Sequence, residues 1–218
     1  VPLEALVIAA RGPDVADPGR PVGARPALLP ELEQAGVSLR SWDQLEEDDK
    51  KALFGIFEEH IFPVLTPLAV DPGHPFPYIS NLSLSLAVRV LDPLTREQRF
   101  ARVKVPSNLS RFVQLPGSST FVPLEQVIAV HLDELFPGMD ISEVAAFRVT
   151  RNADLTLEEN EADDLLAAVE VELRRRRFGR AVRLEVAHTM SEELRDLLIR
   201  ELDLDDDDVY DFAGPLDL

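Results

Sequence analysis

The chain has 218 residues, 45% hydrophobic and 28% charged, a composition that indicates a folded globular protein rather than a disordered one. It contains no cysteine, which excludes disulfides and thiolate metal sites and fits a reducing cytoplasm. Its net charge of −18 disfavours nucleic-acid binding, because phosphate contacts need Lys and Arg side chains. No apolar stretch approaches the roughly 20 residues that cross a bilayer, so we expect no transmembrane segment. The chain opens without Met or a signal-peptide layout, which indicates an excised piece of a longer protein.

The first part of the chain predicts a loop followed by a helix. Residues 11–30 are rich in Pro, Gly, Ala and Asp and show no apolar period, which is typical of a loop or linker. Apolar residues then recur every three or four positions at Leu53, Ile56, Phe57 and Ile61. We therefore expect a helix from about Glu46 to Ile61 that ends before Pro63.

Residues 62–78 carry prolines at positions 63, 67, 72, 75 and 77. Proline fixes φ and removes a backbone donor, so an ordinary central strand is excluded here. Aromatic and aliphatic residues alternate with these prolines, and leaving their apolar surface exposed to water would be unfavourable in free energy. We expect a rigid, buried segment, called the proline strap below, that joins the N-terminal helix to the following sheet.

Strict alternation from Leu82 predicts a half-buried strand, with leucines and valines on one face and small or polar residues on the other. A second alternating run at 100–105 completes an expected antiparallel hairpin over 82–106. Further strands are expected at Arg111–Leu115 and at Phe121–Val122.

The second half alternates between helices and strands. The expected elements are a helix from Pro123 to the Pro137–Gly138 stop, a strand at Val144–Arg151, a helix at 157–178, a strand at Val182–Val186, and a helix that follows the capping-box spacing of Thr189–Glu192 and ends near Leu202. The acidic tail after Asp203 is expected to lead out of the domain. This order predicts an α+β fold, with an antiparallel or mixed sheet packed with several helices and preceded by a short helical N-terminal segment.

The usual enzyme motifs are missing: the sequence has no phosphate-binding loop, dinucleotide fingerprint, HExxH or Gly-x-Ser-x-Gly. The four histidines, His60, His74, His131 and His188, show no metal-ligand spacing, and we interpret them as structural. His74 lies in a proline turn that could present an imidazole to a phosphoryl group, so phosphoryl transfer to His74 remains an alternative.

Two groups of basic residues could bind phosphate. Arg174–Arg177 could hold phosphates through guanidinium groups, although complementing the dipole at a helix end is the simpler explanation. Basic residues on the expected strands form the second group, a possible path for a polyphosphate chain: Arg102, Lys104, Arg148 and Arg151.

Several phrases occur in the order and spacing of a known family. They are VLTPLAVDP at 64–72, HPFP at 74–77, SNLSL at 80–84, VKVP at 103–106, HLDELFPG at 131–138, FRVTRN at 147–152 and RRFG at 176–179. From about residue 36 to residue 218, the chain resembles the first polyphosphate kinase family, the phosphohistidine type.

The resemblance implies a four-part parent enzyme with an N-terminal helical domain, a middle head domain, and two C-terminal domains that hold the phosphorylated histidine and most ATP contacts. Residues 1–61 would then be a remnant of the N-terminal domain, residues 62–203 the head domain, and residues 204–218 an acidic linker. The Asn-Leu-Asp-Glu-Phe phrase that contacts ATP in the family has no counterpart here. The resemblance therefore assigns no catalytic, nucleotide-binding or metal-binding residue to this chain.

The resemblance further implies a cytoplasmic phosphotransferase that uses ATP, Mg and inorganic polyphosphate, forms homo-oligomers and carries a phosphohistidine, with membrane association of the parent as an alternative. This piece is expected to be inactive alone, to bind no cofactor, and to serve dimerisation and the shaping of the polyphosphate path. The competing hypothesis is a self-standing protein interaction module without enzymatic activity.

Overall fold

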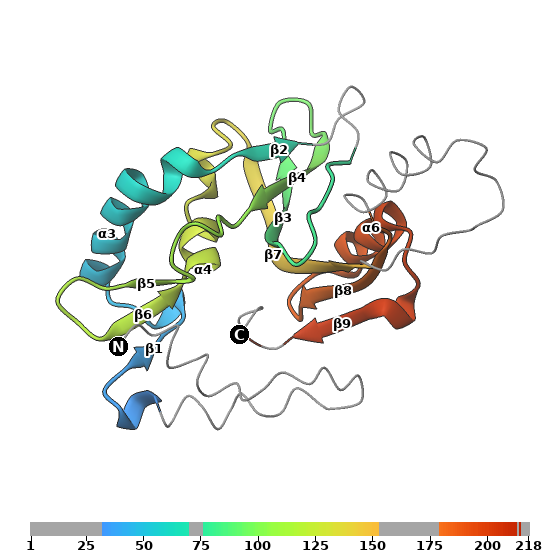
Figure 1. The fold of residues 1–218 in the computed structure, drawn as a ribbon. Coiled ribbons are helices and arrows are strands. Elements are labelled where there is room, and N and C mark those ends of the chain that lie inside the picture. Colours follow the sequence, from blue (N-terminus) through green and yellow to red (C-terminus); the bar gives the residue numbers. More distant parts are fainter. Residues whose placement is uncertain (1–31, 70–75, 153–178, 213, 215–218) are drawn as a thin grey trace, which may run out of the picture.

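The computed structural model describes residues 32–69, 76–152, 179–212 and 214, which form two sheets and several helices (Figure 1). The α+β class expected from the sequence is confirmed. The expected loop at 11–30, the expected helix at 157–178 and residues 70–75 of the proline strap lie outside the described residues.

The larger sheet has six strands in the order β2-β4-β3-β7-β8-β9. The strands are β2 (Pro67–Ala69), β3 (Leu84–Leu91), β4 (Gln98–Lys104), β7 (Asp140–Arg151), β8 (Ala181–Ala187) and β9 (Val209–Phe212). All neighbours pair antiparallel except β8 and β9, which are parallel. The predicted hairpin is confirmed by the antiparallel pairing of β3 with β4, in which Leu86 lies opposite Val103.

The smaller sheet has three strands in the order β1-β6-β5. These are β1 (Ser38–Leu39), β5 (Phe112–Gln114) and β6 (Thr120–Pro123). β1 pairs parallel with β6, and β5 and β6 form an antiparallel pair that agrees with the two short strands expected from the sequence.

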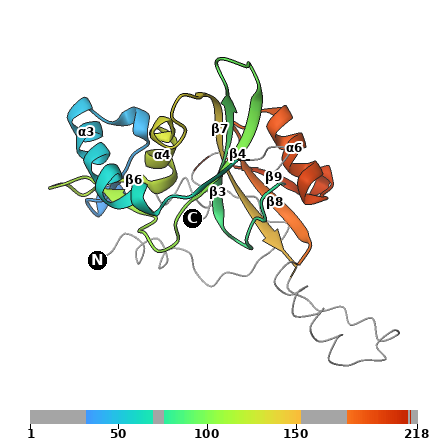
Figure 2. The same cartoon turned by 90° about the horizontal axis from the view of Figure 1, so that it is seen from above.

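Among the described residues, helices α3 (Glu47–Ile56), α4 (Leu124–Ala129) and α6 (Glu192–Leu202) pack against the sheets. α3 continues as a π-helical turn at Phe57–Ile61, which confirms the predicted helix from Glu46 to Ile61. Short 3-10 turns lie at Trp42–Gln44, Phe62–Val64, Leu132–Glu134 and Asp206–Asp208. α3 and α4 lie on one side of the larger sheet and α6 on the other (Figure 2).

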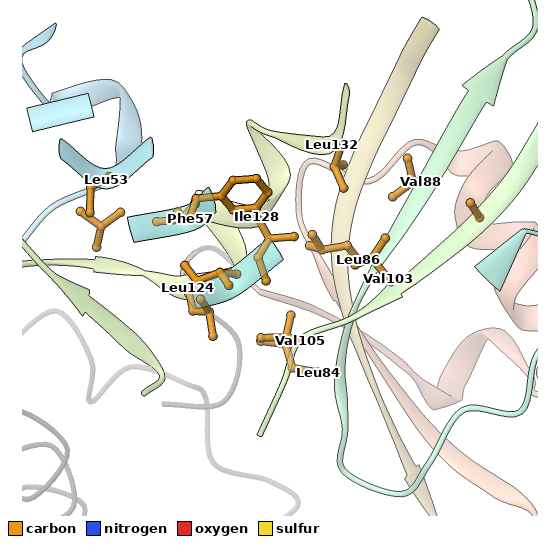
Figure 3. Close-up of a cluster of buried hydrophobic side chains, with 14 of the residues drawn as sticks. Leu53, Phe57, Leu84, Leu86, Val88, Val103, Val105, Leu124, Ile128 and Leu132 are labelled. Carbon is orange, nitrogen blue, oxygen red and sulfur yellow. The ribbon is translucent and has the colours of Figure 1, made fainter. Parts of the chain in front are cut away.

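This arrangement creates two hydrophobic cores, one on each side of the larger sheet. In the first, Phe57 and Ile128 point toward Leu86 and Val103 of the β3–β4 hairpin (Figure 3). In the second, leucines of α6 pack with residues of β7 and β8, namely Leu194, Leu198, Phe147, Val149, Leu184 and Val186. β3 serves both cores, so its predicted half-buried state is wrong: Ser85 and Ala87 are at least as buried as Leu84 and Leu86. The covering layers on both faces explain this difference.

The helix predicted from Pro123 to Pro137 is interrupted after the six residues of α4. α4 ends at Ala129, and the backbone leaves the helical region at His131, where φ is −117° and ψ is 25°. The His131 ring lies against Trp42, Phe54 and Phe57, with centroid distances of 5.2, 5.1 and 4.6 Å. The helix thus ends where the His131 ring packs against these three aromatic side chains.

The proline strap is less buried than we predicted from the sequence. Its described part includes β2, an edge strand that begins at Pro67, where a missing backbone donor is tolerated. Phe62, Val64 and Leu68 keep 39%, 44% and 43% of their surface exposed, so full burial of these side chains was wrong. The strap is anchored further along, where Phe76 stacks on Phe100 at 5.2 Å and Ile79 is fully buried.

Segments on either side of two expected domain limits contact the same sheet and core. The segment after Asp203, expected to be a linker, contributes β9 to the larger sheet and Phe212 to the first core. The expected limit between residues 61 and 62 crosses one continuous core, because Phe57 packs in the same cluster as Leu86.

Candidate basic sites on the larger sheet

The four basic residues singled out from the sequence lie on the larger sheet but not on one face. Alternation along β4 places Arg102 and Lys104 on the α6 side, together with Phe100. Arg151 ends β7 and reaches the same side, where its Nε donates to the Ile79 carbonyl. Arg148 lies on the opposite side, next to Leu84 of β3. A single strip of four residues is therefore not formed.

Arg102 is a buried cation with 5% of its surface exposed. Its Nε donates to Ser85 Oγ at 3.1 Å and its Nη1 donates to the Tyr78 carbonyl at 3.3 Å, while Nη2 is buried without a hydrogen-bond partner. Burial lowers the pKa of the Arg102 guanidinium, since desolvation disfavours the charged form. Its contacts fasten the chain at Tyr78 to the sheet.

Arg151 makes a second attachment to the same segment. Its Nε lies 2.7 Å from the Ile79 carbonyl oxygen and its Nη1 lies 2.8 Å from the Gly179 carbonyl oxygen. The guanidinium carbon lies 4.4 Å from the centre of the Tyr78 ring, and the Arg151 backbone N–H donates to Asn81 Oδ1 at 2.7 Å. Burial lowers the pKa of Arg151, and Tyr78 partly offsets this effect. Arg102 and Arg151 thus hold consecutive carbonyls, and we interpret both as structural.

Gly179, the last residue of the RRFG phrase, lies where the backbone leaves no room for a side chain. A Cβ at this position would collide with the Asn152 carbonyl oxygen, and the neighbouring Asn152 N–H donates to the Arg180 carbonyl at 2.9 Å. This close backbone approach explains the requirement for glycine.

Arg148 belongs to a different kind of group, an ion-pair cluster on the face opposite α6. It donates through Nε to Glu185 Oε2, and Glu185 is buried with 4% of its surface exposed. Arg183 contacts the other oxygen of the same carboxylate, with Nη2 3.1 Å from Glu185 Oε1. The Arg183 guanidinium lies 4.0 Å from the centre of the Tyr210 ring on β9.

Sequence reasoning missed Arg183 and Glu185, although both lie on the strand expected at 182–186. Their spacing of two residues already placed them on one face of that strand. The sequence alone does not reveal that β8 pairs with β7, and this pairing places Glu185 opposite Arg148. Lys104, by contrast, is exposed at the end of β4.

The histidines that the structure describes have structural surroundings. His131 Nδ1 lies 2.8 Å from the Val127 carbonyl oxygen, and His188 Nδ1 lies 3.2 Å from the Phe212 carbonyl oxygen. Because a carbonyl oxygen can only accept, each Nδ1 carries the proton in these contacts. His60 is exposed beside Glu59. His74 and Arg174–Arg177 lie outside the described residues.

No group of three or more His, Asp or Glu side chains is placed to hold a metal ion within 32–69, 76–152 and 179–212. Over the same part of the chain, none of the helices has the length and apolar content that a bilayer crossing requires.

Comparison with known proteins gives a consistent result. Residues 48–218 match the family described as "Polyphosphate kinase middle domain". The chain is 55% identical over 192 residues to a polyphosphate kinase of Streptomyces coelicolor, covering 88% of this chain and 26% of the relative. A polyphosphate kinase of Synechocystis is 53% identical over 203 residues, covering 88% of this chain and 28% of the relative. The chain thus spans about a quarter of the length of these relatives.

A solved structure shows the same fold. The crystal structure of polyphosphate kinase from Porphyromonas gingivalis matches with a TM-score of 0.68 and 27% identity. The match covers 88% of this chain and 28% of that chain.

Proposed function

Because this chain belongs to the polyphosphate kinase middle-domain family, we propose that it is the supporting, non-catalytic region of an enzyme that reversibly transfers the ATP γ-phosphate to inorganic polyphosphate. The family resemblance stated from the sequence is confirmed by the comparisons. The activity itself belongs to a longer protein, since the chain spans about a quarter of its relatives.

The observation that carries this proposal is the match of residues 48–218 to a middle domain, with relatives that extend well beyond it. In-line phosphoryl transfer needs positioning and neutralisation of charge on the moving phosphoryl group. ATP, Mg and a phosphohistidine would supply that chemistry in other parts of the enzyme. His131 and His188, each hydrogen-bonded to a backbone carbonyl, fit a structural part in this region.

We assign this region two tasks in the longer enzyme: contacts between subunits of a homo-oligomer and the walls of the polyphosphate path. Support for the second task is Arg183, whose side chain is 34% exposed where it pairs with the buried Glu185. Lys104, exposed at the end of β4, is a further candidate for contact with polyphosphate. The enzyme is expected in the cytoplasm, with membrane association of the longer protein as an alternative that cell fractionation can decide.

A self-standing interaction module is the second candidate function. The exposed apolar side chains of Phe62, Val64 and Leu68 favour it, because they follow one another along the strap and would suit a protein surface. In the first candidate function, the same side chains would contact another part of the longer enzyme.

The test compares this chain with a polypeptide from the same gene that continues past Leu218. With ATP and Mg, the longer protein should make polyphosphate and acquire an acid-labile phosphoryl label, whereas the isolated chain should neither make polyphosphate nor hydrolyse ATP. Turnover by the stringently purified isolated chain would contradict the non-catalytic assignment. Label on the isolated chain that disappears in His74→Ala would instead support phosphoryl transfer to His74. A gene that ends at Leu218, with no activity in any product, would favour the interaction module.

A further inference from the structure

Three cations lie on the α6 side of the larger sheet, near the Tyr78–Ile79 segment: Arg102, Lys104 and Arg151. The two arginines donate to neutral groups, namely backbone carbonyls and one serine hydroxyl. Lys104 follows Arg102 by two residues on β4, so it shares the face of Arg102, and it is exposed. Within the part of the chain that the structure describes, no carboxylate forms an ion pair with any of the three. A chain whose net charge is −18 thus carries a local excess of positive charge here.

Arg102 is the most deeply buried of these cations, with 5% of its surface exposed. Its Nη2 is buried without a hydrogen-bond partner, so the described residues leave one donor of this guanidinium unsatisfied. A buried charge is costly unless an opposite charge compensates it. Salt and water screen such a charge much less than they screen an exposed one. Arg102 therefore adds an attraction for anions to the surface that lies above it.

Exposed apolar side chains lie beside these cations. Leu68 of β2 is opposite Arg102 in the antiparallel β2–β4 pair, so both side chains are on the same face, and Leu68 keeps 43% of its surface exposed. Tyr78 keeps 39% exposed, although its carbonyl accepts from Arg102 and its ring lies 4.4 Å from the Arg151 guanidinium. Leu68, Tyr78 and Lys104 are called the strap-edge surface below.

We infer that the strap-edge surface docks an acidic segment of a partner protein, in which carboxylates alternate with apolar side chains. The carboxylates of such a segment are attracted by Lys104 and by the two arginines below it. Its apolar side chains remove the exposed surfaces of Leu68 and Tyr78 from water. β2 is an edge strand of the larger sheet, and an extended segment along this edge presents every second side chain to the same face.

The exposed apolar side chains distinguish this partner from a phosphate chain, the other polyanion for which Lys104 is a candidate. A phosphate chain presents oxygens along its whole length, so it gains nothing from contact with Leu68 or Tyr78. Arg102 is too deeply buried to form the bidentate contacts by which arginine recognises phosphate. An acidic amphipathic segment uses both the positive charge and the apolar surface, and it therefore fits this surface better.

The experiment measures binding of a fluorescein-labelled peptide, in which Glu and Leu alternate, to the 218-residue chain by fluorescence anisotropy. Two comparison peptides each lack one property: Gln replaces Glu in the first, and Ser replaces Leu in the second. The Glu–Leu peptide should bind more tightly than either of them. Its affinity should fall as the salt concentration rises, because part of the attraction is electrostatic.

Two exposed positions of the surface are then changed, each with a matched control. Lys104→Gln should weaken binding of the Glu–Leu peptide about fivefold, the upper range for an ion pair at a surface. Leu68→Ser should weaken it by a similar factor of about fivefold through lost apolar contact. The controls are Lys51→Gln, on α3 across the sheet, and Leu94→Ser, in the β3–β4 turn, and both side chains are exposed. Each control should change the affinity by less than about twofold, because distant charges are screened.

Several results would overturn the inference. No measurable binding of the Glu–Leu peptide, equal binding of the Glu–Ser peptide, or equal losses in the variants and their controls would each do so. Binding of inorganic polyphosphate instead of the peptide, lost in Lys104→Gln and kept in Leu68→Ser, would assign the surface to a phosphate chain. Dimers of the chain in sedimentation that Leu68→Ser abolishes would assign it to a second copy.

The inference goes beyond the proposed function and fails separately from it. The peptide measurement uses the 218-residue chain, whereas synthesis of polyphosphate is measured on the longer protein. If the longer protein makes polyphosphate but this chain does not bind the peptide, the docking surface is wrong and the function stands. If the chain binds the peptide as expected but the longer protein makes no polyphosphate, the function is wrong and the docking surface stands.

Discussion

The two faces of the larger sheet are closed in different ways. On the α3 and α4 side, the β3–β4 hairpin is covered by apolar side chains, among them Phe57 and Ile128, which lie fully buried (Figure 3). On the α6 side, apolar packing covers β7 and β8, but the cover over β4 includes Arg102 and the Tyr78–Ile79 segment. The β3–β4 hairpin is covered by hydrophobic contacts on the α3 and α4 side, whereas its cover on the α6 side also uses arginines that donate to backbone carbonyls.

This difference shows that whether an arginine of the sheet is buried or available for binding depends on which face of the sheet it lies on. The backbone at the end of the strap, Tyr78, and at the following residue, Ile79, has carbonyls to which Arg102 and Arg151 donate. Arg148 lies on β7, which pairs with β3, the strand next to Arg102. The alternation of side chains along the strands nevertheless places Arg148 on the opposite face of the sheet from Arg102.

Phe57→Ala should produce the largest effect and test the apolar face. Phe57 is fully buried and its ring lies against His131, so truncation leaves a cavity between α3 and the sheet. We expect a loss of about 3 to 5 kcal/mol in the free energy of unfolding, measured by urea denaturation. Leu94→Ala is the control, because Leu94 is almost fully exposed in the hairpin turn. A loss at Phe57 no larger than that at Leu94 would show that this core does not stabilise the fold.

Arg102→Ala tests the polar attachment on the other face. The substitution removes the guanidinium that donates to the buried Ser85 hydroxyl and to the Tyr78 carbonyl, which should cost about 2 kcal/mol in the same assay. Lys104→Ala, two residues along the same strand, should change stability by less than about 0.5 kcal/mol because Lys104 is exposed. Similar small losses at both positions would remove the distinction between the two faces.

Phe76→Ala measures how firmly the strap is held beside that attachment. The ring is half-buried and stacks on Phe100, so we expect a loss of about 1 to 2 kcal/mol, below the range for a fully enclosed ring. His74→Ala should cost far less, because the sequence predicts that His74 lies in a proline turn. Thermal unfolding of the two variants shows which substitution destabilises the fold more. Equally small losses of stability would show that the strap does not pack against the sheet.

Ser191→Ala probes the start of the helix that covers the second face. Ser191 Oγ accepts from the Leu194 N–H at 3.2 Å and donates to Glu143 Oε2 at 2.8 Å. Loss of this N-cap should cost about 1 kcal/mol, and Ser191→Thr should retain most of the stability. An unchanged melting temperature in the alanine variant would show that α6 is fixed by its leucines alone.

Asp92→Asn should give the smallest effect, since the hairpin turn belongs to neither face. The backbone N–H groups of Thr95 and Leu94 donate to Asp92 and lower its pKa. A lowered carboxyl pKa stabilises the fold above the unfolded value of about 3.9, and this contribution is lost as pH falls through the folded value. The melting temperatures of the variant and the original chain should therefore differ slightly at about pH 6 and converge toward about pH 2. A constant difference across this range would contradict the assignment.

Local patterns were enough for several elements. The β3–β4 hairpin follows from alternation, and the helix from Glu46 to Ile61 follows from its apolar period. The helix expected from Pro123 to Pro137 could not be predicted correctly, because its break depends on His131 packing against Trp42 and Phe57 from distant parts of the chain. β9 was missed for a similar reason. The acidic sequence around it is typical of a solvated tail, and only its pairing with β8 makes it a strand.

The sequence by itself determined the fold class, the family and the strand positions of Arg102, Lys104, Arg148 and Arg151, because composition, periodicity and ordered motifs can be read along the chain. Only the tertiary structure decided which of those residues face one another. Strand pairing sets Arg148 opposite Glu185 and brings Arg183 beside them, while the cover over β4 buries Arg102. Register and burial arise from contacts between segments far apart in sequence, and a shift of one residue in register would exchange the faces of all these side chains.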